Sequence, residues 1–441
     1  MVNLKAMPYN LSDADITWVQ GIIASMTPEE KVGQLFWQLT SSNKEEYLQE
    51  LMEKYHLGGI RYNGMPGQMV LNQNRILQKY AKVPVFIACN PEKGGDGVCP
   101  DGTQVGSGVK VGATGKPKYA QAMGRVSGAQ IKATGCNMAF APVVDITYNF
   151  ECEEVLLRAF GGNPKLVASM GKAYMDGLRE TEGVFCCAKH FPGNGQDYRD
   201  AHISNNVNHF THDKWMETYG HVYKTLIDGG LDAIMGGHIL MPEYMAEINP
   251  EINADTIMPG TLCKEIMTDL LRGELGFNGM VVTDASHMVG MTNRMKRVDM
   301  LPAAINAGCD MFLFFNDPAE DYATMLNAYN TGIISEERMT EALSRILGSN
   351  PRNACACVDD QEDHKEYYRK DIANQNIQHD ARQSIYHPPH PSVNLLVNED
   401  EVRQGGRCNH QPAHEFDEYI IGPCVLLNNQ CRQHIIAHND D

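Results

Sequence analysis

Between residues 30 and 348 the chain alternates short apolar runs with amphipathic stretches of helical length, separated by polar loops. The apolar runs are β-branched or flanked by glycine, which is typical of buried strands. Eight of them are predicted strands: Gln34–Leu39, Gly58–Tyr62, Val83–Cys89, Asn137–Asp145, Gly183–Lys189, Leu231–Gly236, Gly279–Thr283 and Cys309–Phe314. Helices are predicted between most of them, for example Lys118–Ala133, Lys165–Glu180, Asp213–Asp228, Pro259–Arg272 and Val298–Ala307, and a last helix is predicted at Ser335–Leu347.

This alternation predicts an α/β fold, a closed (β/α)8 TIM-type barrel, because alternating elements favour a parallel sheet and eight strands close around a filled interior. An open doubly wound sheet is the alternative. Polar residues gather directly after the predicted strands, at the end of a barrel where active sites form. These segments are Asn90–Gly95, Ala141–Asp145, Lys189–Gly195, Gly236–His238, Thr283–His287 and Phe314–Asp317.

The pattern changes near Gly348. The following segment holds eight of the 16 histidines and shows no sustained helix or strand period. We therefore predict two parts: a barrel domain over residues 1–348, and an irregular tail over 349–441 that could be a truncated remnant of a second domain. One helix around Asp360–Asn374 is expected in the tail. Its Cys355 and Cys357 lack the spacing of a known zinc motif.

Composition narrows the function classes. The 441 residues are 43% hydrophobic and carry a net charge of −18, so nucleic acid and anionic lipid are poor partners. We find no membrane span, no secretory leader and no GxGxxG or Walker pattern. Several of the 13 cysteines lie in apolar runs, at Cys136, Cys186, Cys187 and Cys309, as buried free thiols would. These features predict a cytoplasmic protein.

Asp284 directly follows the predicted strand Gly279–Thr283. Its carboxylate should emerge at the barrel mouth, where an anion could attack a substrate or stabilise a cation. A capping or salt-bridging aspartate would fit the same position.

The motif KHFPGNG places Lys189 and His190 at another strand end. An ammonium and an imidazole can hydrogen-bond neighbouring hydroxyls of a sugar ring. A Schiff-base lysine, as in barrel aldolases, is an alternative function for Lys189. A surface lysine beside a core histidine is the plain structural interpretation.

Asp200 and His202 follow on the loop formed by residues 194–204. In extended backbone, side chains two residues apart point the same way, so the carboxylate can orient the imidazole. Such a histidine can donate a proton to a leaving oxygen and later accept one from a nucleophile.

The sequence leaves the functions of two further polar residues open. Arg158, in LLRAFGGNP, could bind hydroxyl or carbonyl oxygens or make a structural ion pair. His238 follows AIMGG and could line the floor of the site, although a hydrogen-bonded core histidine is the favoured interpretation.

Together, KHFPGNG with DAH downstream, RAFGGNP upstream and MVVTDA near the end of the barrel resemble glycoside hydrolase family 3, in its bacterial β-N-acetylglucosaminidase branch. The resemblance runs from about Met26 to Leu347 and implies a retaining hydrolase on a (β/α)8 barrel. The matching positions imply that Asp284 is the nucleophile, and that His202 is the acid/base with Asp200 as its partner.

The resemblance also implies that Arg158, Lys189 and His190 hold the terminal sugar. The family's third loop usually reads DQEGG, whereas this chain has NPEKGG, so Glu92 or Asn90 is expected to supply the contacts of that loop. The expected substrate is a carbohydrate with a terminal N-acetylglucosamine, and no cofactor or metal is expected.

Two variants keep the same nucleophile: a β-glucosidase and an N-acetylglucosaminide phosphorylase. A phosphorylase is reasonable because a histidine acid/base lacks the carboxylate charge that would repel phosphate. An alternative of another class is an inactive sugar-binding barrel. The sequence leaves the aglycone and the oligomeric state open.

Overall fold

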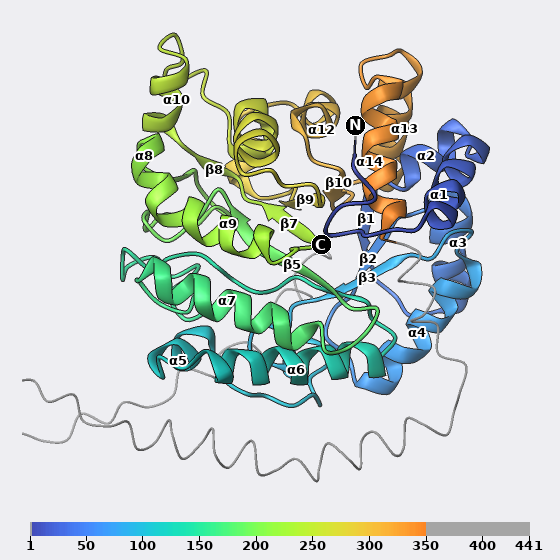
Figure 1. The fold of residues 1–441 in the computed structure, drawn as a ribbon. Helices are drawn as coiled ribbons and strands as arrows, with labels where there is room; N and C mark the ends of the chain where they lie inside the picture. The colour runs from blue at the N-terminus through green and yellow to red at the C-terminus, as the bar shows by residue number, and fades with distance from the viewer. Residues whose placement is uncertain (1, 350–441) are drawn as a thin grey trace, which may run out of the picture. The chain divides into compact units, whose positions relative to one another are not determined.

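The computed structural model describes residues 2–349, in which eight parallel strands form a closed barrel (Figure 1). This confirms the predicted barrel and excludes the open sheet. Around the barrel, neighbouring strands follow the order β1-β10-β9-β7-β5-β4-β3-β2. Their bounds are β1 (Phe36–Leu39), β2 (Gly59–Arg61), β3 (Phe86–Cys89), β4 (Met138–Ala139), β5 (Phe185–Phe191), β7 (Ala233–Gly236), β9 (Met280–Ala285) and β10 (Met311–Leu313). A separate two-stranded sheet, not predicted, pairs β6 (Asn206–Val207) with β8 (Ile239–Leu240).

All eight predicted strands exist, but most are shorter than the apolar runs. The largest difference is at β4, where the predicted strand continued to Asp145. Pro142 has no N–H to donate to a neighbouring strand, so the regular ladder stops before it. Val143 forms only an isolated bridge with Lys189. The chain nevertheless stays buried as far as Asp145, which brings that carboxylate to the barrel mouth.

Helices surround the barrel and follow its strands (Figure 1). The α-helices are α1 (Asp13–Ser25), α2 (Pro28–Gly33), α3 (Glu45–Tyr55), α4 (Gly67–Tyr80), α5 (Gly108–Ala113), α6 (Pro117–Ala133), α7 (Pro164–Leu178), α8 (His212–Trp215), α9 (His221–Asp228), α10 (Pro242–Ile248), α11 (Val289–Thr292), α12 (Arg297–Ala307), α13 (Pro318–Asn330) and α14 (Glu336–Gly348). Short 3₁₀ turns are η1 (Gly95–Gly97) and η3 (Gly260–Leu262). The π-helical segments are η2 (Met216–Gly220) and η4 (Glu265–Glu274).

Two of the predicted α-helices contain π-helical segments in the structure. The predicted helix over Asp213–Asp228 is α8, η2 and α9 in succession, and most of the one over Pro259–Arg272 is π-helical. The apolar side still faces the core, since Trp215, Tyr219 and Leu226 are fully buried. Hydrophobic spacing detects that side, but it does not detect the looser backbone pairing of a π-turn.

Local capping fixes where several helices begin. Thr27 and Glu30 form a reciprocal capping box at α2, in which each side chain accepts the backbone N–H of the other residue. At α7, the Asn163 side chain accepts the N–H of Leu166, and Pro164 occupies the first turn. That cap marks where the loop carrying Arg158 ends and α7 begins.

Aromatic side chains fill the barrel. Trp37 stacks on Phe86 with ring centroids 6.1 Å apart, and its second neighbour Phe140 lies at 5.1 Å. The Trp37 indole N–H donates to the Met311 sulfur at 3.1 Å. The interior is therefore packed, and a ligand site can form only above this layer, at the strand ends.

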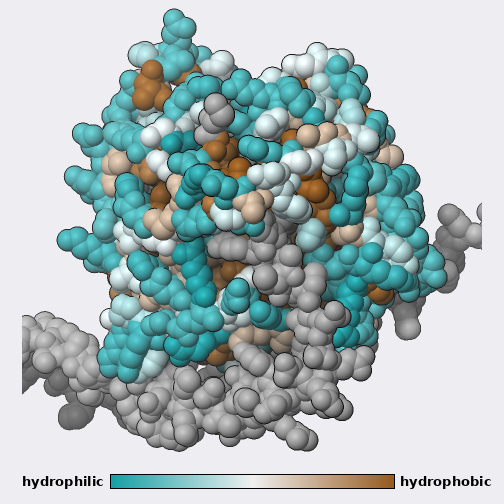
Figure 2. Space-filling view, turned by 45° about the vertical axis from the view of Figure 1, so that its right-hand side comes forward, coloured by the Kyte–Doolittle hydropathy of each residue, from teal (hydrophilic) through white to brown (hydrophobic). Residues whose placement is uncertain are grey.

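The described surface is mainly hydrophilic on the face shown in Figure 2. Eight cysteines lie in the described residues, and all are free thiols and buried, including the four that the sequence placed in apolar runs. No helix within residues 2–349 is both long enough and apolar enough to cross a membrane. The predicted tail, its helix at 360–374 and its Cys355 and Cys357 lie outside the described residues, apart from Ser349.

Candidate active site

A cavity of about 350 Å³ lies at the carboxyl ends of the barrel strands. This volume falls within the usual range for small-molecule sites, roughly 300–1,000 Å³. The cavity is lined by Leu39, Arg61, Tyr62, Asn63, Gly64, Asn90, Phe140, Glu154, Arg158, Lys189, His190, His202, Met235, Asp284, Ala285, His287, Leu313 and Phe314. A larger cavity of about 550 Å³, between α12 and α13, contains none of the predicted site residues.

Asp284 lies on β9, near its carboxyl end, and its side chain is 17% exposed. One carboxylate oxygen, Oδ1, accepts the N–H of Ala285 at 2.7 Å, while Oδ2 lies 3.9 Å from His190 Nε2. Burial alone would raise the pKa of this carboxyl. The neighbouring histidines, the Ala285 N–H and Lys189 outweigh burial, so the pKa of Asp284 lies below its ordinary value. The side chain is therefore an accessible anion at the site.

His202 lines the same cavity, and its side chain is 53% exposed. Its Nδ1 lies 2.6 Å from Asp200 Oδ1, which also accepts the His202 backbone N–H at 2.8 Å. Because Asp200 occupies Nδ1, the Nε2 atom is left free for chemistry. The sequence thus correctly brought together Asp200 and His202, and it also placed His202 and Asp284 in one pocket.

The predicted reason for the Asp200–His202 contact was wrong. The segment is a turn rather than extended backbone, since the N–H groups of Ile203 and Ser204 donate to the Asp200 carbonyl at 3.1 and 2.9 Å. Asp200 therefore meets His202 as an aspartate that caps its own turn, accepting the N–H two residues on. The carboxylate still orients the imidazole.

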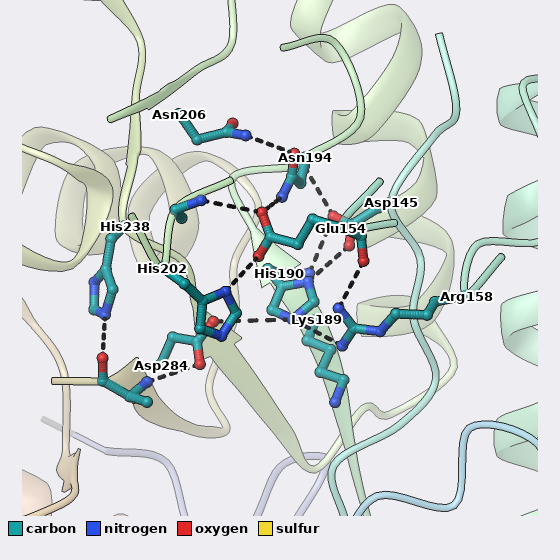
Figure 3. Close-up of polar contacts among 12 residues, drawn as sticks. Asp145, Glu154, Arg158, Lys189, His190, Asn194, His202, Asn206, His238 and Asp284 are labelled. Atoms are coloured by element: carbon teal, nitrogen blue, oxygen red, sulfur yellow. Dashed lines mark hydrogen bonds and ion pairs between the residues drawn. The ribbon is translucent and has the colours of Figure 1, made fainter. Parts of the chain in front are cut away.

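His190 is held from below by Asp145, which the sequence analysis did not single out. His190 Nδ1 lies 2.7 Å from Asp145 Oδ2, and Asp145 Oδ1 accepts the N–H groups of His190 and Asn194 at 3.2 and 2.8 Å. This leaves His190 Nε2 facing Asp284 and Arg158 (Figure 3). The only sequence signal for Asp145 was its position directly after an apolar run.

Arg158 and Lys189 both pair with Glu92. Arg158 Nε and Nη2 lie 2.7 and 2.9 Å from the two Glu92 oxygens, and Lys189 Nζ lies 2.5 Å from Oε1. Burial alone would raise the pKa of Glu92, but the charges of Lys189 and Arg158 lower it well below the ordinary glutamate value. The Lys189 side chain is 3% exposed and ion-paired with Glu92, and burial lowers the pKa of Lys189 below the ordinary lysine value in spite of that pair.

Glu92 was expected to contact the substrate. Both of its oxygens are occupied by the two cations, and Asn90, rather than Glu92, is among the residues that line the cavity. We propose that Glu92 orients Arg158 and Lys189 toward the cavity.

Replacing Glu92 with glutamine should lower the free energy of unfolding by roughly 3–5 kcal/mol, because the buried Lys189 and the partly buried Arg158 lose their counter-charge. A carboxyl whose pKa is depressed on folding stabilises the protein above the ordinary glutamate pKa of about 4.3 and loses that contribution as the pH falls below it. The difference in the free energy of unfolding between parent and variant, measured by urea denaturation, should therefore become smaller below about pH 4. The exposed Glu182→Gln serves as the control, and equal stability of E92Q and parent at pH 7 would contradict this prediction.

Glu154 is a buried pocket residue that the sequence analysis missed; its side chain is 5% exposed. Its Oε2 accepts the Asn194 side-chain amide at 2.9 Å and the Ala201 N–H at 3.3 Å, and Oε1 lies 4.0 Å from His202 Nδ1. Burial raises the pKa of Glu154 above its ordinary value. Its sequence neighbourhood, CEEVLLR, resembles an ordinary polar turn and gave no signal.

His238 proves to be a core histidine. Its Nδ1 lies 2.8 Å from the Thr261 hydroxyl and its Nε2 lies 3.1 Å from the Ala285 carbonyl. Burial lowers the pKa of His238. The side chain is not among the cavity-lining residues, so it supports the backbone beside Asp284 rather than the floor of the pocket.

Among residues 2–349, one group has a geometry that could hold a metal ion: Glu154, Asp200 and His202 each offer a ligand atom within 4.8 Å of the others. Hydrogen bonds already account for this cluster, because Asp200 bonds His202 and Glu154 bonds Asn194 and Ala201. The arrangement therefore suits proton transfer without requiring a metal.

Comparison with known proteins gives a family match over most of the described chain. The family model described as glycosyl hydrolase family 3 N terminal domain matches residues 27–348. A curated relative from Cellulomonas fimi, named beta-N-acetylglucosaminidase/beta-glucosidase, is 38% identical over 79% of this chain and 61% of its own length. Beta-hexosaminidase A of Pseudoalteromonas piscicida is 30% identical over 68% of this chain and 54% of its own length. The chain thus spans about three fifths or less of these relatives.

Two solved structures are similar along most of the chain. A beta-glucoside phosphorylase bound to 2FGlc is 36% identical, with a TM-score of 0.78, covering 82% of this chain and 68% of that one. A family 3 beta-N-acetylglucosaminidase from Paenibacillus sp. str. FPU-7 is 28% identical, with a TM-score of 0.71, covering 78% of this chain and 68% of that one.

Proposed function

Since this chain belongs to glycosyl hydrolase family 3, we propose that it is a retaining exo-glycosidase that removes a terminal β-linked N-acetylhexosamine, such as N-acetylglucosamine. The main support for this proposal is that the Asp284 carboxylate and the His202 imidazole line one cavity of monosaccharide size. An anionic nucleophile and a proton donor around one sugar-sized space are what double displacement at an anomeric carbon requires.

In the first step, an Asp284 oxygen attacks the anomeric carbon and forms a carbon–oxygen bond. The bond to the leaving oxygen breaks, and protonated His202 donates its proton to that oxygen. The product is a glycosyl ester of Asp284. The low pKa of Asp284 supports this role, because the carboxylate is ionised before the attack.

In the second step, neutral His202 accepts a proton from water while the water oxygen attacks the same carbon. The ester bond breaks and Asp284 leaves as a carboxylate. Two displacements return the original configuration. Asp200 keeps the reactive Nε2 of His202 available by holding Nδ1.

Arg158, Lys189 and His190 are the proposed sugar-binding groups. All three line the cavity, and they are held by the carboxylates of Glu92 and Asp145. Preorganised donors bind hydroxyl groups without first losing side-chain entropy. The proposed mechanism needs no cofactor.

A second candidate is phosphorolysis, in which phosphate replaces water in the second step. The similarity to a solved beta-glucoside phosphorylase favours it. The same structure, and the double name of the Cellulomonas fimi relative, also keep glucosides open as substrates.

Nitrophenyl β-N-acetylglucosaminide and nitrophenyl β-glucoside should be compared as substrates, each with and without phosphate. We expect faster nitrophenol release from the N-acetylglucosaminide and free sugar as the main product. Faster nitrophenol release from the glucoside would show that the enzyme prefers glucosides to N-acetylglucosaminides. Sugar 1-phosphate as the main product would show that the reaction is phosphorolysis rather than hydrolysis. Sugar binding without turnover of either compound would instead support an inactive sugar-binding barrel.

The proposal extends to a cytoplasmic location, supported by the eight buried free thiols. Reducing compartments keep cysteines in this state.

A further inference from the structure

The pocket contains one buried carboxylate that the proposed mechanism does not use. Glu154 extends from the loop after β4 into the cavity, and its carboxylate lies beside the ring of His202 (Figure 3). It is neither the nucleophile nor the residue that orients the acid/base, since Asp284 and Asp200 have those positions.

The place of Glu154 beside His202 puts its charge where the second reactant must enter. His202 protonates the leaving oxygen and later activates the incoming one, so both oxygens occupy the space beside its ring. Glu154 Oε1 lies 4.0 Å from His202 Nδ1. Glu154 lines the same cavity as His202 and Asp284, and Asp200 is not among the lining residues, so an incoming acceptor enters a space bordered by the Glu154 carboxylate.

The carboxylate is fixed there, and the basic group paired with it, His202, is neutral in the second step of the proposed mechanism. Its Oε2 accepts hydrogen bonds from two neutral donors, the Asn194 side-chain amide and the Ala201 backbone N–H. Asn194 lies at the start of the loop that carries His202, and Ala201 directly precedes His202. Arg158 and Lys189, the nearby cations, form their ion pairs with Glu92. Within the described residues, no lysine or arginine forms an ion pair with Glu154.

We propose that Glu154 selects the acceptor of the second step: its carboxylate keeps inorganic phosphate and other anions away from the glycosyl-enzyme and so favours water. The inference rests on the proposed function and assigns this residue the choice between hydrolysis and phosphorolysis. A histidine acid/base would by itself admit phosphate, and Glu154 restores the negative charge that a carboxylate acid/base would have supplied.

The two competing reactions break the same bond. With water, the carbon–oxygen ester bond to Asp284 breaks, the bond to the water oxygen forms, and His202 accepts the proton. With hydrogen phosphate, an already ionised phosphate oxygen attacks the anomeric carbon, Asp284 leaves with the electron pair of the ester bond, and no base is needed. Only the second acceptor brings negative charge toward Glu154.

The test compares the parent enzyme with Glu154→Gln in phosphate buffer at pH 7.5, using the nitrophenyl substrate that the parent cleaves. Glutamine keeps an oxygen that can accept the Asn194 and Ala201 hydrogen bonds, and it removes only the charge. We expect the ratio of sugar 1-phosphate to free sugar to rise about tenfold or more, because a like-charge repulsion at short range is removed. An unchanged ratio overturns the inference.

Two variants sharpen the comparison. Glu153→Gln removes a charge from the exposed neighbouring position in the same loop and should keep the parent ratio. Glu154→Asp keeps the charge with a shorter side chain and should also stay near the parent ratio. A rise as large in either variant as in E154Q would overturn the assignment to the Glu154 charge.

The parent enzyme supplies an independent measurement if E154Q fails to fold. With methanol and azide offered together, the parent should form the methyl glycoside and little glycosyl azide, because only azide is anionic. Comparable amounts of both products overturn the inference, as does a parent that already makes mainly sugar 1-phosphate. If the parent releases no nitrophenol, the proposed function itself is contradicted. If the parent releases nitrophenol normally but E154Q leaves the ratio of sugar 1-phosphate to free sugar unchanged, only the inference about Glu154 is contradicted.

Discussion

Replacing Asp284 with alanine should lower kcat/KM for a nitrophenyl β-N-acetylglucosaminide by roughly 10⁴-fold or more, because the glycosyl-enzyme cannot form without its carboxylate. The measurement is steady-state nitrophenol release. The loss should come without unfolding, since Asp284 Oδ1 accepts only the neighbouring Ala285 N–H and its other contact is a histidine at 3.9 Å. The exposed Asp299→Asn is the matched control and should keep parent activity.

Rescue of the same variant identifies the role of Asp284 rather than its mere importance. Azide can enter the space that the missing side chain leaves and attack the anomeric carbon from the nucleophile's face. A single displacement inverts the configuration, so the expected product is the α-glycosyl azide. This face is opposite the acceptor side, where Glu154 is proposed to act. A D284A variant with more than about 1% of parent activity and no azide effect would refute the nucleophile assignment.

Replacing His202 with alanine should give the second-largest loss, roughly 10²–10⁴-fold in kcat/KM, the usual contribution of a positioned general acid/base. The loss should be largest for an oligosaccharide, whose leaving oxygen needs a proton. It should be much smaller for a dinitrophenyl glycoside, whose leaving group departs as an anion. Steady-state rates across leaving groups measure the difference.

Two variants separate proton transfer from general damage to the loop. His221→Ala removes an exposed histidine at the start of α9 and should leave all rates unchanged. Asp200→Ala removes the partner of His202 Nδ1 together with the acceptor of the His202 backbone N–H, and should show the same leaving-group trend with a smaller loss. Equal losses of H202A on all leaving groups would contradict the acid/base role.

The fold was predictable because its signals are local and repeated. Each strand of the barrel is an apolar run flanked by glycine or polar loops, and eight such runs leave few architectures open. Strand ends were less accurate, as at β4, because whether a residue pairs depends on the neighbouring strand and on Pro142. The short β6–β8 sheet had no such signal, since each strand is two residues long.

The site was predictable only where a residue follows a strand. Asp284, Lys189 and His190 lie on strands whose ends face the barrel mouth, so their position along the chain already places them. Glu92 shows the limit of this reasoning. It was assigned to the pocket from its loop, but the two cations that occupy its oxygens come from residues 66 and 97 positions farther along the chain, so the sequence could not reveal them.

The sequence by itself determined the barrel, the Asp284 position and the family motifs, because periodicity and short motifs depend on residues close together in the chain. Only the tertiary structure decided that Asp145 holds His190, that Glu92 neutralises Arg158 and Lys189, and that Glu154 lies beside His202. Each of these contacts joins residues from different strands or loops of the barrel. Charge pairing and burial act through space, and a linear pattern contains no distances between loops.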